Sequence, residues 1–306
     1  MIPHLLRSAQ EYLALRRALG FKLHRETWLL PDFVAFLTAH GSAFITTDLA
    51  VQWAQRPTGT SAEWCAKRLA AIRGFARHQR AFDPRTEIPS ADLIPYRANR
   101  RHPYLYTQAE IAALMREARG LRPAVMAATY ETLIGLLATT GMRVGEALAL
   151  DDGDVDWHRS LLKVRHAKFQ KSRLVPLHAS TLAALRGYVA RRDRLCVRLG
   201  PWLFTSTVGT RVIHQRLLQV FRRLVSRAAI GSGRAIRPRL HDFRHAFAVS
   251  TIRDWYRSGT DVERRLFSLS TYLGHVSPTS TYWYLTATPE LLALAGKRLE
   301  RWRGRR

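Results

Sequence analysis

Apolar and polar positions alternate with a helical period through the first third of the chain, from Leu5 to roughly Ala81. The clearest stretch, AEWCAKRLAAIRGFARHQR, places apolar side chains on one face of a helix and basic side chains around them. Almost no acid interrupts the basic face, which favours contact with phosphates. We therefore predict a helical domain over residues 1–97. The apolar positions are Trp64, Leu69, Ile72, Phe75 and Ala76, and the basic ones Lys67, Arg68, Arg73, Arg77 and Arg80.

Prolines interrupt the helical pattern between Phe82 and His102, because a proline ring blocks continuous helix. Basic residues crowd the end of this stretch, and we place a linker at residues 98–103. The segment YTQAEIAALMREA then starts a new helix, with Thr107 as N-cap and Glu110 as its capping-box partner. A second domain is predicted over residues 104–306.

The second domain mixes helices with a short stretch of strand-like alternation. In YETLIGLLATTGMRVGEALAL, Gly141 breaks one helix and Arg143 stands at the start of the next. In SLLKVRHAKFQKSRLVPL, two apolar runs flank a basic tip, which predicts a β-hairpin. Helices resume from about Thr181, so the fold class predicted is mainly α with a small β-sheet (α+β). The paired apolar positions of the hairpin are Leu162, Val164, Leu174 and Val175.

The net charge of the chain indicates which kind of partner it binds. Lys and Arg number 49 against 23 Asp and Glu, a formal net charge of +26, which predicts a polyanion such as double-stranded DNA. No apolar run approaches the roughly 18 residues of a membrane span, and MIPHLLRSAQEY lacks a signal-peptide core, so we expect a cytoplasmic protein without membrane contact. Cys65 and Cys196 are expected to be buried small hydrophobes.

Three short motifs could carry chemistry. In LHDFRHAFAV, His241 and Arg244 are three positions apart and share one helical face. Arg143 opens a helix, where free N–H groups and the helix dipole favour an anion, and a guanidinium can grip phosphate with two bonds. Lys168 lies at the hairpin tip, which can reach into a groove. Taken singly, each motif is better explained by solvated surface residues.

The acidic run DDGDVD raises the alternative of a metal site. Asp152, Asp154 and Asp156 have the spacing that begins a calcium loop. Such a loop needs glycine at its sixth position and glutamate at its twelfth, but this chain has Trp157 and Lys163 there. We interpret the run as a solvated turn before the hairpin and predict no metal site.

In order along the chain come TGMRVGEALAL, a hairpin with Lys168 ending in RLVPL, then HDFRH, LGH and a tyrosine nine positions after the LGH histidine. This succession resembles the tyrosine recombinase (phage integrase) family from Tyr104 to about Leu299, and the helical domain resembles its core-binding (SAM-like) domain. LGHVSPTSTYWYLTATPELL resembles members borne by transposons and other mobile elements. The catalytic set that the resemblance implies is Arg143, Lys168, His241, Arg244, His275 and Tyr284.

The resemblance also implies roles for these residues. Tyr284 would be the nucleophile, whereas Tyr282 lies two positions early and would be a packing or positioning residue. Arg143 and Arg244 would clamp the phosphate, and Lys168 would protonate the departing 5′ oxygen. His241 would accept the tyrosine proton or orient it, and His275 would donate a hydrogen bond to the phosphoryl group. The product would be a 3′-phosphotyrosine, formed without metal or ATP. His245 is expected to be structural, and Lys171 and Arg173 of the hairpin to contact DNA.

We therefore expect a site-specific DNA recombinase of the integrase or transposase type, associated with a bacterial nucleoid. A type IB-like topoisomerase shares this chemistry and differs in lacking strand exchange. A non-cleaving accessory DNA-binding protein of a mobile element is the third possibility, and the complete residue set argues against it. The last helix, about 289–303, carries the stripe Leu292, Ala295, Leu299 and Trp302. By resemblance it would dock on a neighbouring protomer in a homotetramer on synapsed DNA, unless it packs on its own domain. Other recombinases of the same element are further candidate partners.

Overall fold

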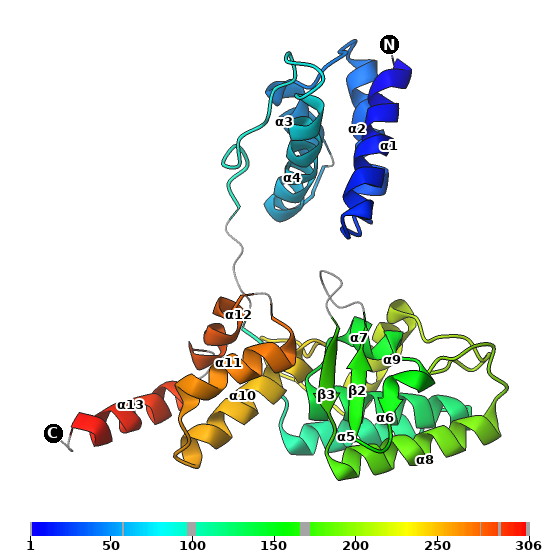
Figure 1. Cartoon of the computed structure of the whole chain (residues 1–306), viewed down its shortest axis with the longest axis vertical. Helices are drawn as coiled ribbons and strands as arrows, with labels where there is room; N and C mark the ends of the chain where they lie inside the picture. Colours follow the sequence, from blue (N-terminus) through cyan, green and yellow to red (C-terminus); the bar gives the residue numbers. More distant parts are fainter. Residues whose placement is uncertain are drawn as a thin grey trace. The chain divides into compact units, whose positions relative to one another are not determined.

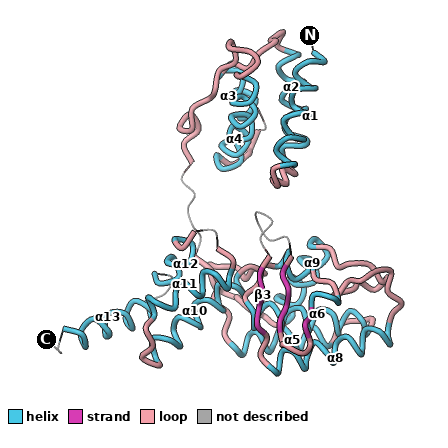
Figure 2. Tube along the Cα trace, in the orientation of Figure 1, coloured by secondary structure: helices cyan, strands magenta, loops and turns pink. Residues whose placement is uncertain are grey.

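The computed structural model describes residues 2–56, 58–96, 102–165, 172–275, 277–286 and 289–303. The chain forms two compact units, residues 1–100 and 101–306, each with its own hydrophobic core (Figure 1). Helices dominate both units, and the strands of the described residues all belong to the second (Figure 2). The predicted mainly helical fold with a small sheet is confirmed. Residues 98–101 of the predicted linker lie outside the described residues.

The first unit consists of α1 (Ile2–Ala18), α2 (Glu26–Ala39), α3 (Thr47–Gln55) and α4 (Ala62–Gln79). Its core gathers the apolar faces of all four helices, and Phe33 meets Trp53 edge-on with ring centroids 5.2 Å apart. The apolar stripe expected on α4 is buried there, with the exception of Trp64, which stacks on Trp28 at its edge. A hydroxyl N-cap, Ser61, starts this helix by accepting a hydrogen bond from the amide of Trp64.

The second unit is built around α6 (Ala124–Thr140), which is apolar on nearly every side and packs most extensively against three other helices. Those neighbours are α5 (Gln108–Arg119), α8 (Ala179–Leu195) and α10 (Asp242–Arg257). The predicted capping box of α5 is confirmed, since Thr107 and Glu110 bond to each other's backbone amides. The short helix α7 (Val144–Ala149) follows α6. The helix α9 (His214–Arg227) is strongly amphipathic and buries its apolar face.

The sheet has three antiparallel strands in the order β1 (Val155–Asp156), β2 (Leu161–Val164) and β3 (Arg173–Pro176). Leu162 pairs with Val175, and both are buried. Leu174 was predicted to pair with Leu162 or Val164, and this is wrong. It pairs with Lys163 and is 58% exposed, because it falls on the other side of the pleat. The strand β1 was not predicted, because it has two residues and the 3-10 turn η1 (Asp152–Asp154) precedes it directly.

The chain ends in α10, α11 (Val262–Leu273), α12 (Thr279–Tyr282), the 3-10 turn η3 (Trp283–Thr286) and α13 (Pro289–Arg303). These elements lie together at one side of the unit (Figure 1). They enclose a small core of their own, which contains Leu266, Leu273, Tyr284 and Leu291. The segment between HDFRH and LGH forms the rest of α10 and then α11. No helix of the described residues combines the length and apolar character needed to cross a membrane.

Candidate active site

Arg143 is held at the start of α7 by a turn that requires glycine. Gly141 ends α6 in the left-handed region with φ +58°, and a Cβ there would lie 2.5 Å from Cδ1 of Phe247. The turn places Arg143 at the N-cap of α7, with its side chain 30% exposed. Its guanidinium donates to Oε1 of Glu146 and to the carbonyl of Gly274, each at 2.8 Å. A partly exposed guanidinium fixed in this way is suited to binding phosphate.

Glu146, a residue that the sequence analysis did not single out, joins two arginines in the interior. Both of its oxygens accept hydrogen bonds from Arg173, at 2.7 and 2.9 Å, and Oε2 also accepts from the backbone amide of Arg143 at 2.9 Å. Burial raises the pKa of this carboxyl, but the bonds and charge of Arg173, followed by those of Arg143, lower it to about 2. The signal was present in the sequence as an acid three residues after Arg143, the capping-box spacing.

Arg173 was predicted to contact DNA, and in the structure its guanidinium is bonded to protein oxygens. Its side chain is only 13% exposed. Besides its two bonds to Glu146, it donates from Nε to the carbonyl of Tyr272 at 2.9 Å. The guanidinium therefore ties strand β3 to α7 and to the end of α11, and its donors are directed at protein oxygens.

Arg244 lies on α10 and is 2% exposed. It donates to the carbonyl of Gly141 at 3.1 Å and to that of Leu273 at 2.6 Å. Burial, followed by the positive charge of Arg143, lowers its pKa to about 10, while Tyr284 and Glu146 act in the opposite direction. The guanidinium remains charged at neutral pH.

His241 stands at the N-cap of α10, three positions before Arg244. Burial lowers its pKa, and the charge of Arg244 lowers it further. The imidazole is therefore neutral at pH 7 and can accept a proton.

His275 directly follows Gly274, which ends α11 with φ +66°. Its Nδ1 lies 2.7 Å from Oγ1 of Thr281, and its ring lies nearly parallel to that of Tyr284, with centroids 6.1 Å apart. Burial and then the charge of Arg244 lower its pKa to about 4, so this imidazole is also neutral at pH 7.

Tyr284 and Tyr282 occupy opposite environments. Tyr284 is 2% exposed and belongs to the small core of α10–α13, whereas Tyr282 is 52% exposed. Two positions along a helical turn correspond to a rotation of roughly 200°, so the two rings point in nearly opposite directions. Of the two roles expected for Tyr282, its exposure argues against packing in the core, and a positioning role stays a prediction.

His245 lies among aromatic rings beside the candidate residues. Its ring meets His241 edge-on at 4.8 Å, Trp283 at 5.4 Å and Tyr284 at 5.5 Å between centroids. Burial, followed by the nearby His241, lowers its pKa to about 3. The histidine is neutral and packs one turn after His241 on α10.

Arg68 of the predicted basic face is also corrected, because it is 5% exposed. Its guanidinium lies 3.7 Å from the ring centroid of Trp53, donates to the Trp53 carbonyl at 2.9 Å and lies 3.7 Å from a carboxylate oxygen of Asp32. Burial lowers its pKa. The cation is thus part of the core of the first unit and cannot track phosphates.

The other predicted basic residues divide into three groups. Arg77 on α4 and Arg80 at its C-cap are exposed, and Lys67 is exposed in an ion pair with Glu63. Arg73 donates to the carbonyls of Pro89 and Ser90 at 2.7 Å each and secures the segment after α4. Lys168 and Lys171 lie outside the described residues.

The acidic run is not the solvated turn that we predicted. Asp154 is 3% exposed and pairs with Arg165, while Asp151 accepts from Arg211 at 2.7 Å. Asp152 accepts two bonds from the fully buried Arg192. These three carboxylates therefore each have an arginine partner, whereas Asp156 accepts hydrogen bonds from the backbone amides of His158 and Arg159. In the described part of the chain, no three His, Cys, Asp or Glu side chains cluster as metal ligands would. Cys65 is buried as expected, but Cys196 is only partly buried.

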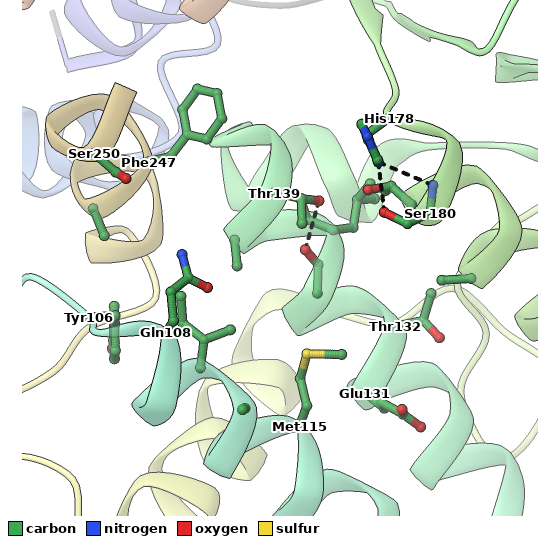
Figure 3. Close-up of a pocket in the computed structure, with 18 of the residues that line it drawn as sticks. Tyr106, Gln108, Met115, Glu131, Thr132, Thr139, His178, Ser180, Phe247 and Ser250 are labelled. Atoms are coloured by element: carbon green, nitrogen blue, oxygen red, sulfur yellow. Dashed lines mark hydrogen bonds between the residues drawn. The ribbon is translucent and has the colours of Figure 1, made fainter. Parts of the chain in front are cut away.

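A cavity of about 1350 Å³ lies elsewhere in the second unit, between α5, α6, α8 and α10. Figure 3 shows Gln108, Met115, Thr139 and Phe247 around it. None of the candidate catalytic residues in the described chain lines this cavity. The candidate site is instead the convergence of Arg143, His241, Arg244, His275 and Tyr284 from four segments.

Comparisons with known proteins agree with this arrangement. The model of the phage integrase family matches residues 105–290. A Sinorhizobium fredii protein named as an integrase/recombinase, y4rB, is 46% identical over 96% of both chains. The tyrosine recombinase XerD of Mycobacterium tuberculosis is 32% identical over 76% of this chain and 72% of its own.

Among solved structures, the Tn1549 transposon integrase in complex with transposon right-end DNA matches with a TM-score of 0.67. It is 17% identical, and the match covers 96% of this chain and 98% of that one. The recombinase XerH bound to a difH substrate matches with a TM-score of 0.65 at 20% identity, over 89% and 78% of the two chains. These two likenesses establish the fold. Together with the family match and the relatives above, they show that the chain belongs to the phage integrase family and is a site-specific tyrosine recombinase.

Proposed function

We propose that the protein cleaves and rejoins DNA at specific sites through a covalent 3′-phosphotyrosine on Tyr284. One observation carries the proposal. Arg143 donates to the carbonyl of Gly274 and Arg244 to that of Leu273, the two residues before His275, whose ring lies beside Tyr284. Two cations, a neutral imidazole and a phenol are thereby gathered around one short loop, which is the set that phosphoryl transfer to a phenol requires.

The residues divide the reaction between them. The phenolic oxygen of Tyr284 attacks the phosphorus, and the bond to the 5′ oxygen of the next nucleotide breaks. His241, kept neutral by burial, accepts the phenolic proton. His275 faces the phosphoryl group and donates a hydrogen bond to it. Arg143 and Arg244 bind the non-bridging oxygens and stabilise the charge that builds on them. We assign protonation of the departing 5′ oxygen to Lys168. The two guanidiniums supply the positive charge, so the proposed reaction uses no metal or ATP.

The link to Tyr284 retains the energy of the phosphodiester, so a 5′-hydroxyl from a second DNA strand can reverse the step and complete strand exchange. The formal net charge of +26 and the exposed Lys67, Arg77 and Arg80 support duplex DNA as the partner. We further propose a homotetramer on synapsed sites, joined through α13. On this helix Leu291 is buried in its own unit, whereas Leu292 is 53% exposed.

The test uses DNA from the ends of the mobile element that encodes the protein, nicked within a candidate recombination site. Cleavage of this DNA releases a short fragment and traps the covalent adduct. Wild type and Tyr282→Phe are expected to form an adduct in the presence of EDTA, and Tyr284→Phe is expected to form none. An adduct on the Tyr284→Phe protein would contradict the assignment. Tight binding with no adduct on any substrate would favour the accessory DNA-binding protein, and relaxation of supercoils without exchange would favour a topoisomerase.

A further inference from the structure

Thr281 has a buried hydroxyl in contact with the candidate active site. Its side chain is 1% exposed, and its Oγ1 lies 2.7 Å from Nδ1 of His275. Thr281 belongs to α12 and precedes Tyr284 by three positions on a continuous helical segment. One hydrogen bond therefore connects the histidine of the LGH motif to the segment that carries the candidate nucleophile.

The direction of this hydrogen bond has a chemical consequence. His275 is neutral at pH 7, and a neutral imidazole has one N–H and one lone pair. A threonine hydroxyl can either donate or accept, so geometry alone allows both tautomers. Because Nδ1 is occupied by Thr281, Nε2 is the ring nitrogen left to face a bound phosphate.

An anionic phosphoryl oxygen needs a hydrogen-bond donor opposite it, since a bare lone pair there would repel it. Nε2 must then carry the single proton, and Nδ1 must accept from the hydroxyl. The partner of the second ring nitrogen commonly fixes the tautomer of a working histidine in this way.

We propose that Thr281 is a positioning residue that donates its hydroxyl proton to Nδ1 of His275 and thereby holds the ring as the Nε2–H donor. This inference rests on the proposed function, in which His275 faces the phosphoryl group. Thr281 acts through His275 and does not touch the reacting atoms.

Substitution of Thr281 by valine removes the hydroxyl at nearly constant volume, and Thr281→Ser retains it. The matched control is Thr279→Val in the same helix, where the hydroxyl is exposed and accepts a hydrogen bond from the neighbouring Ser277. Full-length protein with nitrogen-15 in its histidines gives the tautomer of His275 by NMR without DNA. The nicked substrate described above gives the rate of adduct formation.

We expect the Nε2–H tautomer in wild type, Thr281→Ser and Thr279→Val. In Thr281→Val we expect a mixed or Nδ1–H ring and adduct formation slowed roughly 10- to 100-fold, the usual effect of losing such a supporting bond. Thr281→Ser should restore most of the rate. In a His275→Ala background, adding Thr281→Val should cause no further loss.

An Nδ1–H tautomer in wild type would overturn the inference, as would equal rates for the valine and serine variants. A further loss in the His275→Ala background would also overturn it, because the threonine would then act on something other than the histidine. A wild-type protein that forms no adduct would refute the proposed function instead. The tautomer measurement would still decide the direction of the Thr281 bond.

Discussion

Substitution of Glu146 by glutamine tests how the buried charges of the site are balanced. The carboxylate is 8% exposed and accepts bonds from Arg173 and Arg143 on both oxygens. Glutamine keeps the size of the side chain but removes the negative charge and one acceptor. Arg173 is 13% exposed and would be left with a neutral partner in the interior.

The magnitude follows from the pKa of Glu146, which falls from its ordinary 4.5 to about 2. A tenfold change in proton affinity corresponds to about 1.4 kcal/mol, so the ionised carboxylate contributes on the order of 3 kcal/mol to folding at pH 7. Because the folded pKa is depressed, this contribution is complete above pH 4.5 and is lost as the pH falls towards 2. Between pH 7 and pH 3.5 the advantage over Glu146→Gln should shrink by about 1.4 kcal/mol.

The free energy of opening can be measured for the second unit alone, by hydrogen exchange of peptides from α6 and α7 across a urea series. Glu131→Gln is the matched control. Glu131 is 13% exposed and bonded to Arg119, whose side chain is 63% exposed, so its loss should cost under about 1 kcal/mol. Equal stability of Glu146→Gln and wild type at pH 7 would refute the reasoning, and so would a difference that does not change with pH.

Three further predictions concern other parts of the chain. Arg68→Met should lower the free energy of unfolding of the first unit by about 1–3 kcal/mol and leave the salt dependence of DNA binding unchanged. Arg77→Met should weaken the salt dependence of DNA binding and leave the stability unchanged. Urea unfolding measures the first effect, and binding isotherms across a salt series measure the second. The pKa of His245 is about 3 in the folded protein and 6.5 ordinarily, so wild type should lose stability as the pH falls below 6.5. Thermal unfolding at pH 7 and at pH 5 should show a smaller loss of stability for His245→Gln than for wild type. Truncation after Thr286 should abolish tetramers on synapsed DNA in gel filtration, and intact tetramers would argue against docking through α13.

Local spacing was sufficient to predict the features that depend on nearby residues. The capping box of α5 lies within one turn, and so does the break at Gly141, which ends α6 and places Arg143 at the start of α7. Hydrophobic periodicity likewise predicted the buried stripe of α4 and the hairpin partners Leu162 and Val175. The motifs could also be identified from the sequence, because each one is a short run of residues that lie close together along the chain.

Only the tertiary structure decided which charged side chains are buried and paired within the protein. Arg68 shares a basic helix with Arg77, but Trp53 and Asp32 from other helices cover it. Arg173 and Glu146 are 27 positions apart and meet because β3 passes beside α7. Arg192 meets Asp152 over a separation of 40 positions. The sequence by itself determined which faces of each helix are apolar. Whether a cation binds solvent, DNA or a buried carboxylate depends on what a distant segment places opposite it, because the cost of burying a charge is offset only by a partner at bonding distance.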